Sequence, residues 1–209
     1  MTGRKGHWEE VHASKAPDEV SWYQAEPEPS LSLILASGAA LERGVIDVGA
    51  GASRLPEALV AAGVRDVTAL DIAGSALDRL RARLGPDAPV KFVVADVLNW
   101  RPARRFGVWH DRAVFHFLTR ADERARYART LRAATTEGSR VIIGTFAPDG
   151  PDRCSGLPVM RHDAQSIAKA LGPGFRLVDS LRHEHLTPSG VLQPFTFAVF
   201  TREASNGNQ

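Results

Sequence analysis

The chain has 209 residues, of which 44% are hydrophobic and 24% are charged, and its formal net charge is only +2. This length and balance favour one soluble globular core and are short for two. The arginines are scattered along expected helices and form no stripe with aromatic residues, which argues against a nucleic-acid groove. No apolar run is long enough to span a membrane. The single cysteine, Cys154, excludes an internal disulfide.

Residues 1–7 are polar and lack the apolar core of a secretory signal. A lone cysteine also fits a reducing compartment, so we expect a cytoplasmic protein. From the positions of prolines and apolar runs we expect an N-terminal arm or lid over residues 1–30, one main domain over 31–202 and a tail over 203–209.

The N-terminal arm is rich in aromatic residues for so polar a segment, with Trp8, Trp22 and Tyr23. Side chains of this size need apolar surface to pack against. We therefore expect a helical lid that packs on the core, in which Trp22 and Tyr23 also cover a ligand.

A first helix of the main domain follows the arm. Ser30 is placed to cap it, apolar residues follow over 31–35, and Gly44 is placed near its end.

Residues 45–53, Val-Ile-Asp-Val-Gly-Ala-Gly-Ala-Ser, indicate a buried strand that runs into a glycine turn and then a helix. β-branched residues supply the strand. Gly49 and Gly51 let the backbone turn sharply and leave no Cβ between the main chain and a ligand. The following helix directs its N-terminal N–H groups at whatever lies over the glycines.

A second acid, Asp71, ends the next apolar run, twenty residues after Gly51. That spacing suits strand, helix and strand, with the carboxylate at the tip of the second strand, where it can accept both ribose hydroxyls of a nucleoside. A dinucleotide fingerprint requires a glycine three residues after Gly51, but that position is Arg54. The stretch indicates a nucleoside site and disfavours a nicotinamide dinucleotide and its redox chemistry.

The D-x-G-x-G turn of Asp47, Gly49 and Gly51, with Asp71 ending the next strand, resembles the first two motifs of class I S-adenosylmethionine-dependent methyltransferases. Ser53 stands where that family often has a third glycine. The resemblance implies S-adenosylmethionine as the cofactor. It also implies an α/β fold with a Rossmann-like sheet of seven strands in the order 3-2-1-4-5-7-6, the last strand antiparallel, and helices on both faces.

A third strand over residues 90–95 ends at Asp96 and Val97. In the resembled family an acid at this point hydrogen-bonds the adenine amino group, and its neighbour packs against the ring. The alternative is that Asp96 only caps a turn.

Residues 106–118 read as a fourth strand followed by a turn into a helix. Strand tips that face the ligand crevice carry the chemistry in open α/β sheets, so we expect His110 and Asp111 near the transferred methyl group. His110 is a candidate proton acceptor because the pKa of imidazole lies near neutrality. Arg112 either orients an anionic acceptor or forms a structural ion pair with Asp111.

The arm and the fourth strand refine the resemblance. Two tryptophans fourteen residues apart, followed by a proline and a helix, and the Asp111-Arg112 pair followed by a small residue, are similar to thiopurine S-methyltransferase-like small methyltransferases.

The rest of the chain completes the alternation of helices and strands. We expect helices over 75–84, 122–134 and 163–171, a fifth strand over 140–146, and a hairpin of strands over 175–185 and 193–201. The loop over 147–158 leaves the ligand side of a central strand, so we expect it to form part of the acceptor pocket. Its Cys154 is a thiol near the site, a metal partner of His110 or His162, or a plain loop residue. The absence of ligand spacing favours the last, and we expect no metal.

We predict an S-adenosylmethionine-dependent methyltransferase that acts on a small molecule by in-line methyl transfer, with a thiol or other soft nucleophile as one class of acceptor. The chain lacks the Asn/Asp-Pro-Pro-Tyr/Phe signature of amino-methylating nucleic-acid and glutamine enzymes. As partners we expect a small-molecule acceptor, no nucleic acid and no membrane, with the chain a monomer or homodimer. A protein-lysine methyltransferase and a non-catalytic nucleoside-binding or scaffold protein are the alternatives.

The candidate catalytic residues are His110, Asp111 and Arg112. The candidate cofactor-binding residues are Trp22, Tyr23, Asp47, Gly49, Gly51, Asp71, Ile72, Asp96, Val97 and His110.

Overall fold

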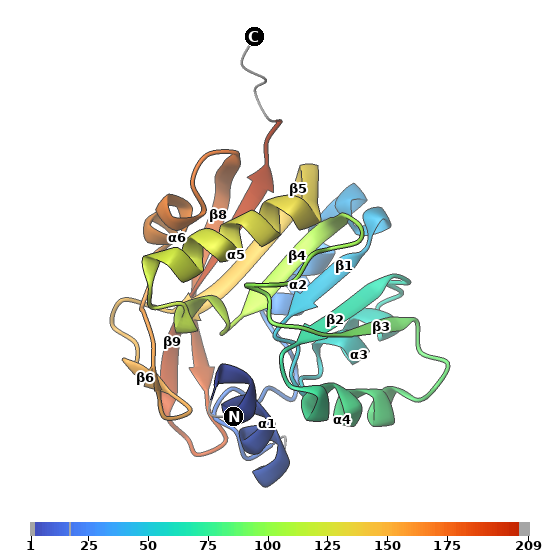
Figure 1. Ribbon diagram of the computed structural model, residues 1–209, viewed down its shortest axis with the longest axis vertical. Helices are drawn as coiled ribbons and strands as arrows, with labels where there is room; N and C mark the ends of the chain where they lie inside the picture. Colours follow the sequence, from blue (N-terminus) through green and yellow to red (C-terminus); the bar gives the residue numbers. More distant parts are fainter. Residues whose placement is uncertain (1–2, 17, 205–209) are drawn as a thin grey trace.

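A computed structural model describes residues 3–16 and 18–204 of the chain. A seven-stranded sheet crosses the molecule in the order β3-β2-β1-β4-β5-β9-β8 (Figure 1), which confirms the predicted 3-2-1-4-5-7-6 arrangement. Residues 1, 2 and 17 of the predicted arm, and residues 205–209 of the predicted tail, lie outside the described residues. Within the described ranges, no helix has the length and apolar character needed to cross a membrane.

Strands β1 to β5 and β8 run in one direction, and β9, which lies between β5 and β8, runs in the opposite direction. The strands are β1 (Val45–Val48), β2 (Val67–Asp71), β3 (Val90–Val94), β4 (Phe106–Arg112), β5 (Thr135–Phe146), β8 (Phe175–Leu186) and β9 (Leu192–Arg202). Because parallel strands present their carboxyl ends at one edge, the residues that follow β1, β2, β3 and β4 gather at the same edge of the sheet.

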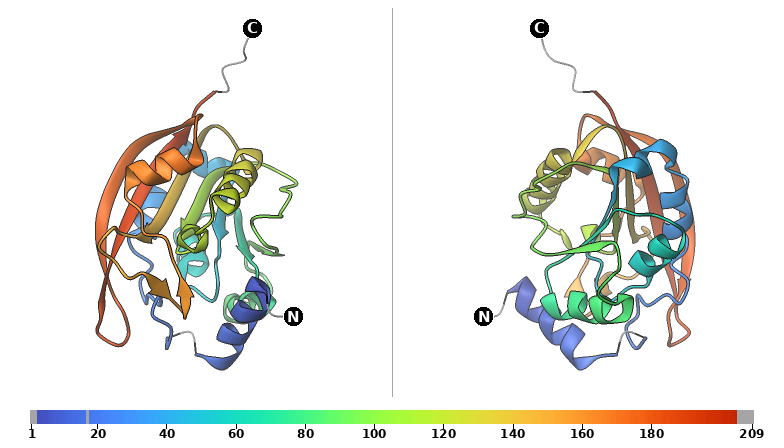
Figure 2. Two further views of the ribbon diagram at one scale, coloured as in Figure 1. Left: turned by 60° about the vertical axis from the view of Figure 1, so that its left-hand side comes forward. Right: turned by 90° about the vertical axis from the view of Figure 1, so that its right-hand side faces the viewer.

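Helices cover both faces of the sheet (Figure 2). A separate apolar core is buried on each face. One face is covered by α5 (Ala121–Ala134) and α6 (Ala164–Leu171), and the other by α2 (Ser30–Leu35), the 3-10 helix η1 (Gly38–Arg43), α3 (Leu55–Ala61) and α4 (Gly74–Leu84). Both faces of β1 and β4 are therefore buried, and this burial includes the polar residues Asp47, His110 and Asp111. The N-terminal helix α1 (Arg4–Ser14) lies apart from these layers, beside α4 at the carboxyl end of the strands.

Several expected boundaries differ from the structure. The first helix of the main domain ends at Leu35 and a 3-10 helix continues to Arg43, so the single helix predicted to end near Gly44 was wrong. Where a helix was expected directly after the turn that follows β4, the chain forms only the short 3-10 helix η2 (Phe115–Phe117). The fifth strand begins earlier than predicted, at Thr135. The 147–158 loop contains a small hairpin of β6 (Arg153–Cys154) and β7 (Leu157–Pro158).

Gly107 lets η1 pack directly against β4. A Cβ at this position would overlap the carbonyl oxygen of Ala40 in η1, and Gly107 N–H donates to the carbonyl of Gly44, 3.0 Å away. The space that the Cβ would need is occupied by backbone atoms of Ala40, which cannot move aside as a flexible side chain could, so the backbone itself would have to shift. This contact fixes where β4 starts and hence where His110 and Arg112 lie.

Replacing Gly107 with Ala should lower the free energy of unfolding by about 1–3 kcal/mol or more, because the added methyl group forces the backbone of η1 away from β4. Gly74→Ala in the first turn of α4, where a Cβ would meet only ordinary contacts, should be neutral or slightly stabilising. Urea denaturation of the two variants measures the difference. Equal stability of both would contradict the close approach.

Candidate active site

The glycine turn after β1 and the end of β2 are joined by one carboxylate. Asp71 accepts the N–H of Gly51 at 2.8 Å with one oxygen and the N–H of Ala73 at 2.8 Å with the other. Gly49 and Gly51 have φ angles of +69° and +55°, a region that side chains disfavour. A carboxylate oxygen has a second lone pair, so Asp71 can hold the turn and still accept ribose hydroxyls.

Burial raises the pKa of Asp71 to about 6, against the opposing effect of its hydrogen bonds from Ala73 and Gly51; the charge of Asp47 adds to the increase. A carboxyl group with this pKa is half-protonated at about pH 6. Its capacity to accept two hydroxyl donors therefore depends on pH in the range where proteins work.

Asp47 and His110 lie side by side because their strands are in register, Asp47 of β1 opposite His110 of β4. Asp47 Oδ1 is 2.7 Å from His110 Nδ1, and His110 Nε2 is 2.9 Å from the Oγ of Ser30. Ser30 was expected to cap a helix, but it is the first residue of α2 and its hydroxyl contacts His110 instead. The three side chains form one buried hydrogen-bonded chain.

Asp111 points to the opposite face of the sheet from His110. One oxygen accepts the N–H groups of Val114 and Phe115, at 3.0 and 3.3 Å, and the other accepts the hydroxyl of Tyr127 at 2.7 Å. Burial raises the pKa of Asp111 to about 6, although these hydrogen bonds oppose the increase. The carboxylate holds the turn after β4 and does not line the cavity described below.

Arg112 lies on the same face of β4 as His110 and lines the cavity. Its Nη2 donates to the carbonyl of Trp22 at 2.5 Å. Within the described ranges no carboxylate lies within ion-pair distance of its guanidinium, so the alternative of an ion pair with Asp111 was wrong. Burial lowers the pKa of Arg112 to about 10, which leaves it charged at neutral pH.

The expected adenine-binding residues also border the cavity. Ile72, Asp96 and Val97 line it at the ends of β2 and β3. Asp96 accepts the N–H of Leu98 at 2.9 Å with one oxygen and the side-chain amide of Asn99 at 2.9 Å with the other. Asp96 therefore does cap a turn, as the alternative proposed, and it also faces the cavity.

Aromatic side chains of the arm cover the cavity. The ring of Trp8 lies 5.9 Å from that of Trp22 and 5.1 Å from that of Phe117, and His12 lies 6.2 Å from Trp22. The ring of His12 also lies over Gly51, where a Cβ would be 3.5 Å from it. The arm thus covers both the glycine turn and the end of β4, as expected of a lid.

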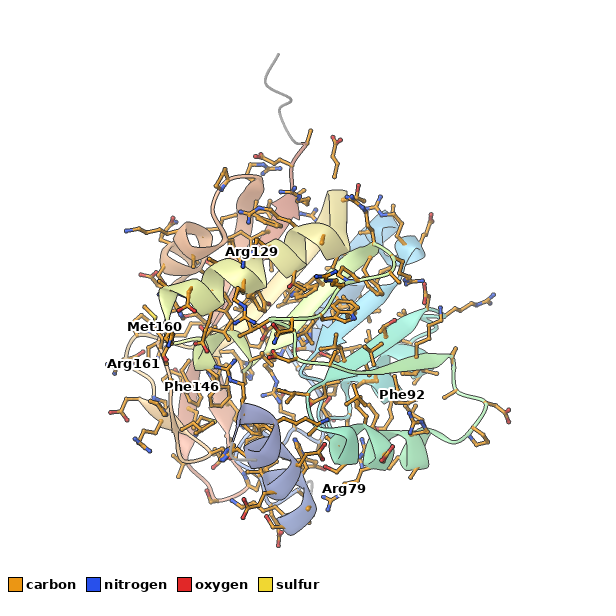
Figure 3. The ribbon with its side chains drawn as sticks, viewed as in Figure 1. Arg79, Phe92, Arg129, Phe146, Met160 and Arg161 are labelled. Atoms are coloured by element: carbon orange, nitrogen blue, oxygen red, sulfur yellow. The ribbon has the colours of Figure 1, made fainter. Side chains whose placement is uncertain are left out.

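Polar contacts fix the lid to three separate elements. In α1, Glu9 accepts the N–H of Gly74 at 2.8 Å and the hydroxyl of Ser75 at 2.6 Å, at the start of α4. These hydrogen bonds, with that of Ser75 the largest cause, lower the pKa of Glu9. Further contacts join Arg4 to Glu123, Arg79 of α4 to the carbonyl of Lys15, and His185 to the carbonyl of Ser21. Figure 3 labels Arg79.

Together these residues enclose one cavity of about 1340 Å³, its open mouth included. All of the predicted cofactor-binding residues, with His110 and Arg112, line it; Asp111 does not. Cys154 of β6 lines it as a thiol, its pKa raised to about 11 by burial. Among the described residues no cluster of His, Cys, Asp and Glu has a metal-binding geometry.

Sequence reasoning missed four contributors to this site. His12, Ser30 and Val114 line the cavity, and Glu9 holds the lid to α4. Ser30 and Glu9 act through contacts more than sixty residues away in sequence, which no local pattern reveals. The side chain of Val114 fills the space that a Cβ at Gly49 would need. This contact exists only in the folded chain, so the sequence gives no signal for Val114.

Residues 45–138 match the model of a family described as "Methyltransferase domain". The match spans β1 to the start of β5 and includes Asp47, Asp71, Asp96 and His110. A comparison with curated protein sequences found no match. The match covers 94 of the 209 residues and bears out the predicted methyltransferase activity. Solved structures of similar fold contain bound S-adenosylmethionine or S-adenosylhomocysteine, in accord with the predicted cofactor.

Solved structures share the fold at low sequence identity. One, from work on the conversion of a disulfide bond into a thioacetal group during echinomycin biosynthesis, has a TM-score of 0.75 and 21% identity, over 96% of this chain and 94% of that one. A methyltransferase from Anabaena variabilis has a TM-score of 0.72 and 15% identity, over 95% and 93% of the two chains. The 1,6-didemethyltoxoflavin-N1-methyltransferase of Burkholderia thailandensis, with bound S-adenosylhomocysteine, has a TM-score of 0.66 and 23% identity, over 92% and 81%.

Replacing Asp71 with Asn should weaken binding of S-adenosylhomocysteine about 10- to 100-fold, because an amide replaces a charged hydrogen-bond acceptor. With Asp71 present, affinity should fall as the pH drops below about 6, by up to about tenfold per unit, since protonation removes the charge that accepts the ribose hydroxyls. Isothermal titration calorimetry between pH 5 and 7.5 measures both effects.

The Asp71→Asn protein is also the control for the pH profile. His12 lies over the same turn and titrates with a lowered pKa, mainly because of burial, so it will contribute any pH dependence that persists in the variant. An unchanged profile after the substitution would contradict the role of Asp71.

Proposed function

We propose that this methyltransferase acts on a small-molecule acceptor, and that a thiol or other soft nucleophile is its reacting group. The observation that carries the proposal is the shape of the cavity. The glycine turn and Asp71 lie at one side, and the cavity continues under Trp8 and Trp22 of the lid, and Phe117 of η2, to the end of β4. A cavity covered by aromatic side chains in this way suits a small acceptor better than a folded one. The structure from echinomycin biosynthesis, which concerns sulfur chemistry, also supports a sulfur acceptor.

The cofactor supplies a methyl group on a sulfonium centre, which is already an activated leaving group. The protein then needs mainly to align the acceptor in line with that group and to exclude water. The turn of Gly49 and Gly51 with Asp71 would fix the nucleoside, and Asp96 and Val97 would border its adenine. The acceptor would take the remaining space beside His110 and Arg112, with the loop that carries Cys154 as part of its wall.

Charge in the cavity favours an electron-rich acceptor over a protein lysine. Its lining contains five cations and three carboxylates. The cations are Arg4, Lys15, Arg54, Arg79 and Arg112, and the carboxylates are Asp47, Asp71 and Asp96. Arg4 is paired with Glu123 outside the lining, so the remaining cations exceed the carboxylates by one. This balance favours a thiolate, or an acceptor with an acidic substituent, over a lysine ammonium.

Arg112 is the group that we propose to orient the acceptor. A guanidinium held in a cavity without a carboxylate partner retains free donors, and a charge-assisted contact from it is about twice as strong as a neutral hydrogen bond. Its position on β4, next to the carbonyl of Trp22, places it under the lid rather than at the glycine turn.

Calorimetry with S-adenosylmethionine and S-adenosylhomocysteine, followed by a screen for S-adenosylhomocysteine release with thiols, amines and carboxylates, tests the proposal. We expect binding of both nucleosides and turnover with at least one thiol. Turnover only with amines would contradict the soft acceptor, and binding without any turnover would support the scaffold alternative.

Replacing Arg112 with Met should lower kcat/KM for 2-mercaptobenzoate about tenfold or more relative to thiophenol, which lacks the carboxylate, because the contact to the anion is lost. The affinity for S-adenosylhomocysteine should stay within a few-fold. Arg129→Met, which removes an exposed arginine of α5 (Figure 3), is the charge control. A loss confined to S-adenosylhomocysteine binding would instead assign Arg112 to the cofactor.

A further inference from the structure

Ser30, His110 and Asp47 form a hydrogen-bonded chain that ends in the cavity. The exposed fractions of the three residues are 1%, 1% and 3%. All three nevertheless line the cavity, so the cavity is the surface from which a ligand can reach them. They come from three different elements, α2, β4 and β1, which the fold brings together at one point.

The hydrogen bonds determine where the proton of the histidine lies. The Asp47 carboxylate can only accept, so His110 Nδ1 carries the hydrogen and donates it across 2.7 Å. When the ring carries this hydrogen alone, Nε2 has a free lone pair that can accept the hydroxyl hydrogen of Ser30 across 2.9 Å. The Ser30 oxygen keeps two lone pairs, which no hydrogen bond given by the described residues occupies.

We propose that this chain is a proton relay that deprotonates the methyl acceptor through Ser30. The inference rests on the proposed function and extends it to the state of the substrate: the acceptor enters the cavity still carrying its proton, as an alkyl thiol or another neutral X–H nucleophile. Ser30 is the catalytic residue that contacts the acceptor, and His110 and Asp47 act through it.

The proton and electron pairs balance in one step. The acceptor S–H bond breaks and its proton passes to Ser30 Oγ while the hydroxyl proton of Ser30 passes to His110 Nε2. The sulfur electron pair forms the bond to the methyl carbon, and the pair of the breaking carbon–sulfonium bond stays on the departing thioether. The imidazolium that results is stabilised by the adjacent Asp47 carboxylate and later releases its proton to water.

A purely structural chain would only tie α2 to the sheet. The two roles differ in how they depend on the acceptor. A relay matters for an acceptor that arrives protonated and is dispensable for one that is already ionised, whereas loss of a structural tie affects both equally.

The test compares two thiols at pH 7 in the same protein. 2-Phenylethanethiol, an alkyl thiol whose pKa lies above the value of about 8.5 for cysteine, is protonated. In 4-nitrothiophenol the nitro group stabilises the thiolate, so this thiol is ionised. Replacing Ser30 with Ala should lower kcat for the alkyl thiol about 100- to 10,000-fold, the usual contribution of general base catalysis. Turnover of the ionised thiol should change by less than about tenfold, and His110→Gln should give the same selective loss.

Ser139→Ala is the matched control. Its hydroxyl is also buried and donates to the carbonyl of Phe106 at 2.8 Å, at the opposite end of β4 from the cavity. It should lower stability by an amount similar to Ser30→Ala while leaving the ratio of the two thiol rates unchanged. Equal losses for both thiols in the Ser30 variant would overturn the relay and leave the proposed function intact.

A second measurement needs no acceptor and separates the two proposals. Nitrogen-15 NMR of the imidazole, with the protein saturated with S-adenosylhomocysteine, should show His110 neutral at pH 7.5 with its hydrogen on Nδ1. A hydrogen on Nε2, or a charged ring, would overturn the relay because no lone pair would remain to accept the proton. If wild-type protein methylates no thiol, the thiol proposal fails, and this measurement still decides whether the relay is present.

Discussion

The hydrogen bond from Gly51 N–H to the Asp71 carboxylate joins the two strand ends on which the site depends. It is possible because β1 and β2 are parallel neighbours, so their carboxyl ends meet at one edge. A glycine with a left-handed backbone brings its N–H toward the acid without a side chain between them. Without this contact the turn would lack its defined shape, and the surface prepared for a nucleoside would be lost.

The buried charges of the site are organised around that turn. Asp71 is held by backbone N–H groups, Asp47 by His110, and Arg112 by a backbone carbonyl of the lid. A buried charge is costly unless it is hydrogen-bonded, and each of these three has such a partner. Arg112 is the one cation among these three groups, and because its partner is a neutral carbonyl its positive charge remains available to a ligand.

The fold was predictable because its signals are local. The strand before Gly49, the acid Asp71 at the next strand end, and the later hairpin each follow from a few neighbouring residues and their periodicity. The strand order came from the resemblance to a known family, since periodicity alone does not rank strands in a sheet. The position of β4 depends on the contact of Gly107 with η1, which no pattern in the chain reports.

The site was only partly predictable, for a related reason. His110 and Asp111 are adjacent in sequence, but alternation along β4 sends one to the cavity and the other to Tyr127. The alternation itself is visible in the sequence; which face carries the ligand is not. Ser30 reads locally as a helix cap, and only the tertiary structure shows that its hydroxyl meets His110 instead.

The placement of α1 has a practical consequence for anyone who attaches a label or fusion partner to the protein. Helix α1 lies beside α4 at the end of the sheet that holds the cavity, whereas β9 ends at Arg202 at the far end (Figures 1 and 2). A bulky group joined ahead of Arg4 would stand next to the lid and its contact with Glu123. The same group joined beyond Arg202 would leave the whole cavity side of the molecule unobstructed.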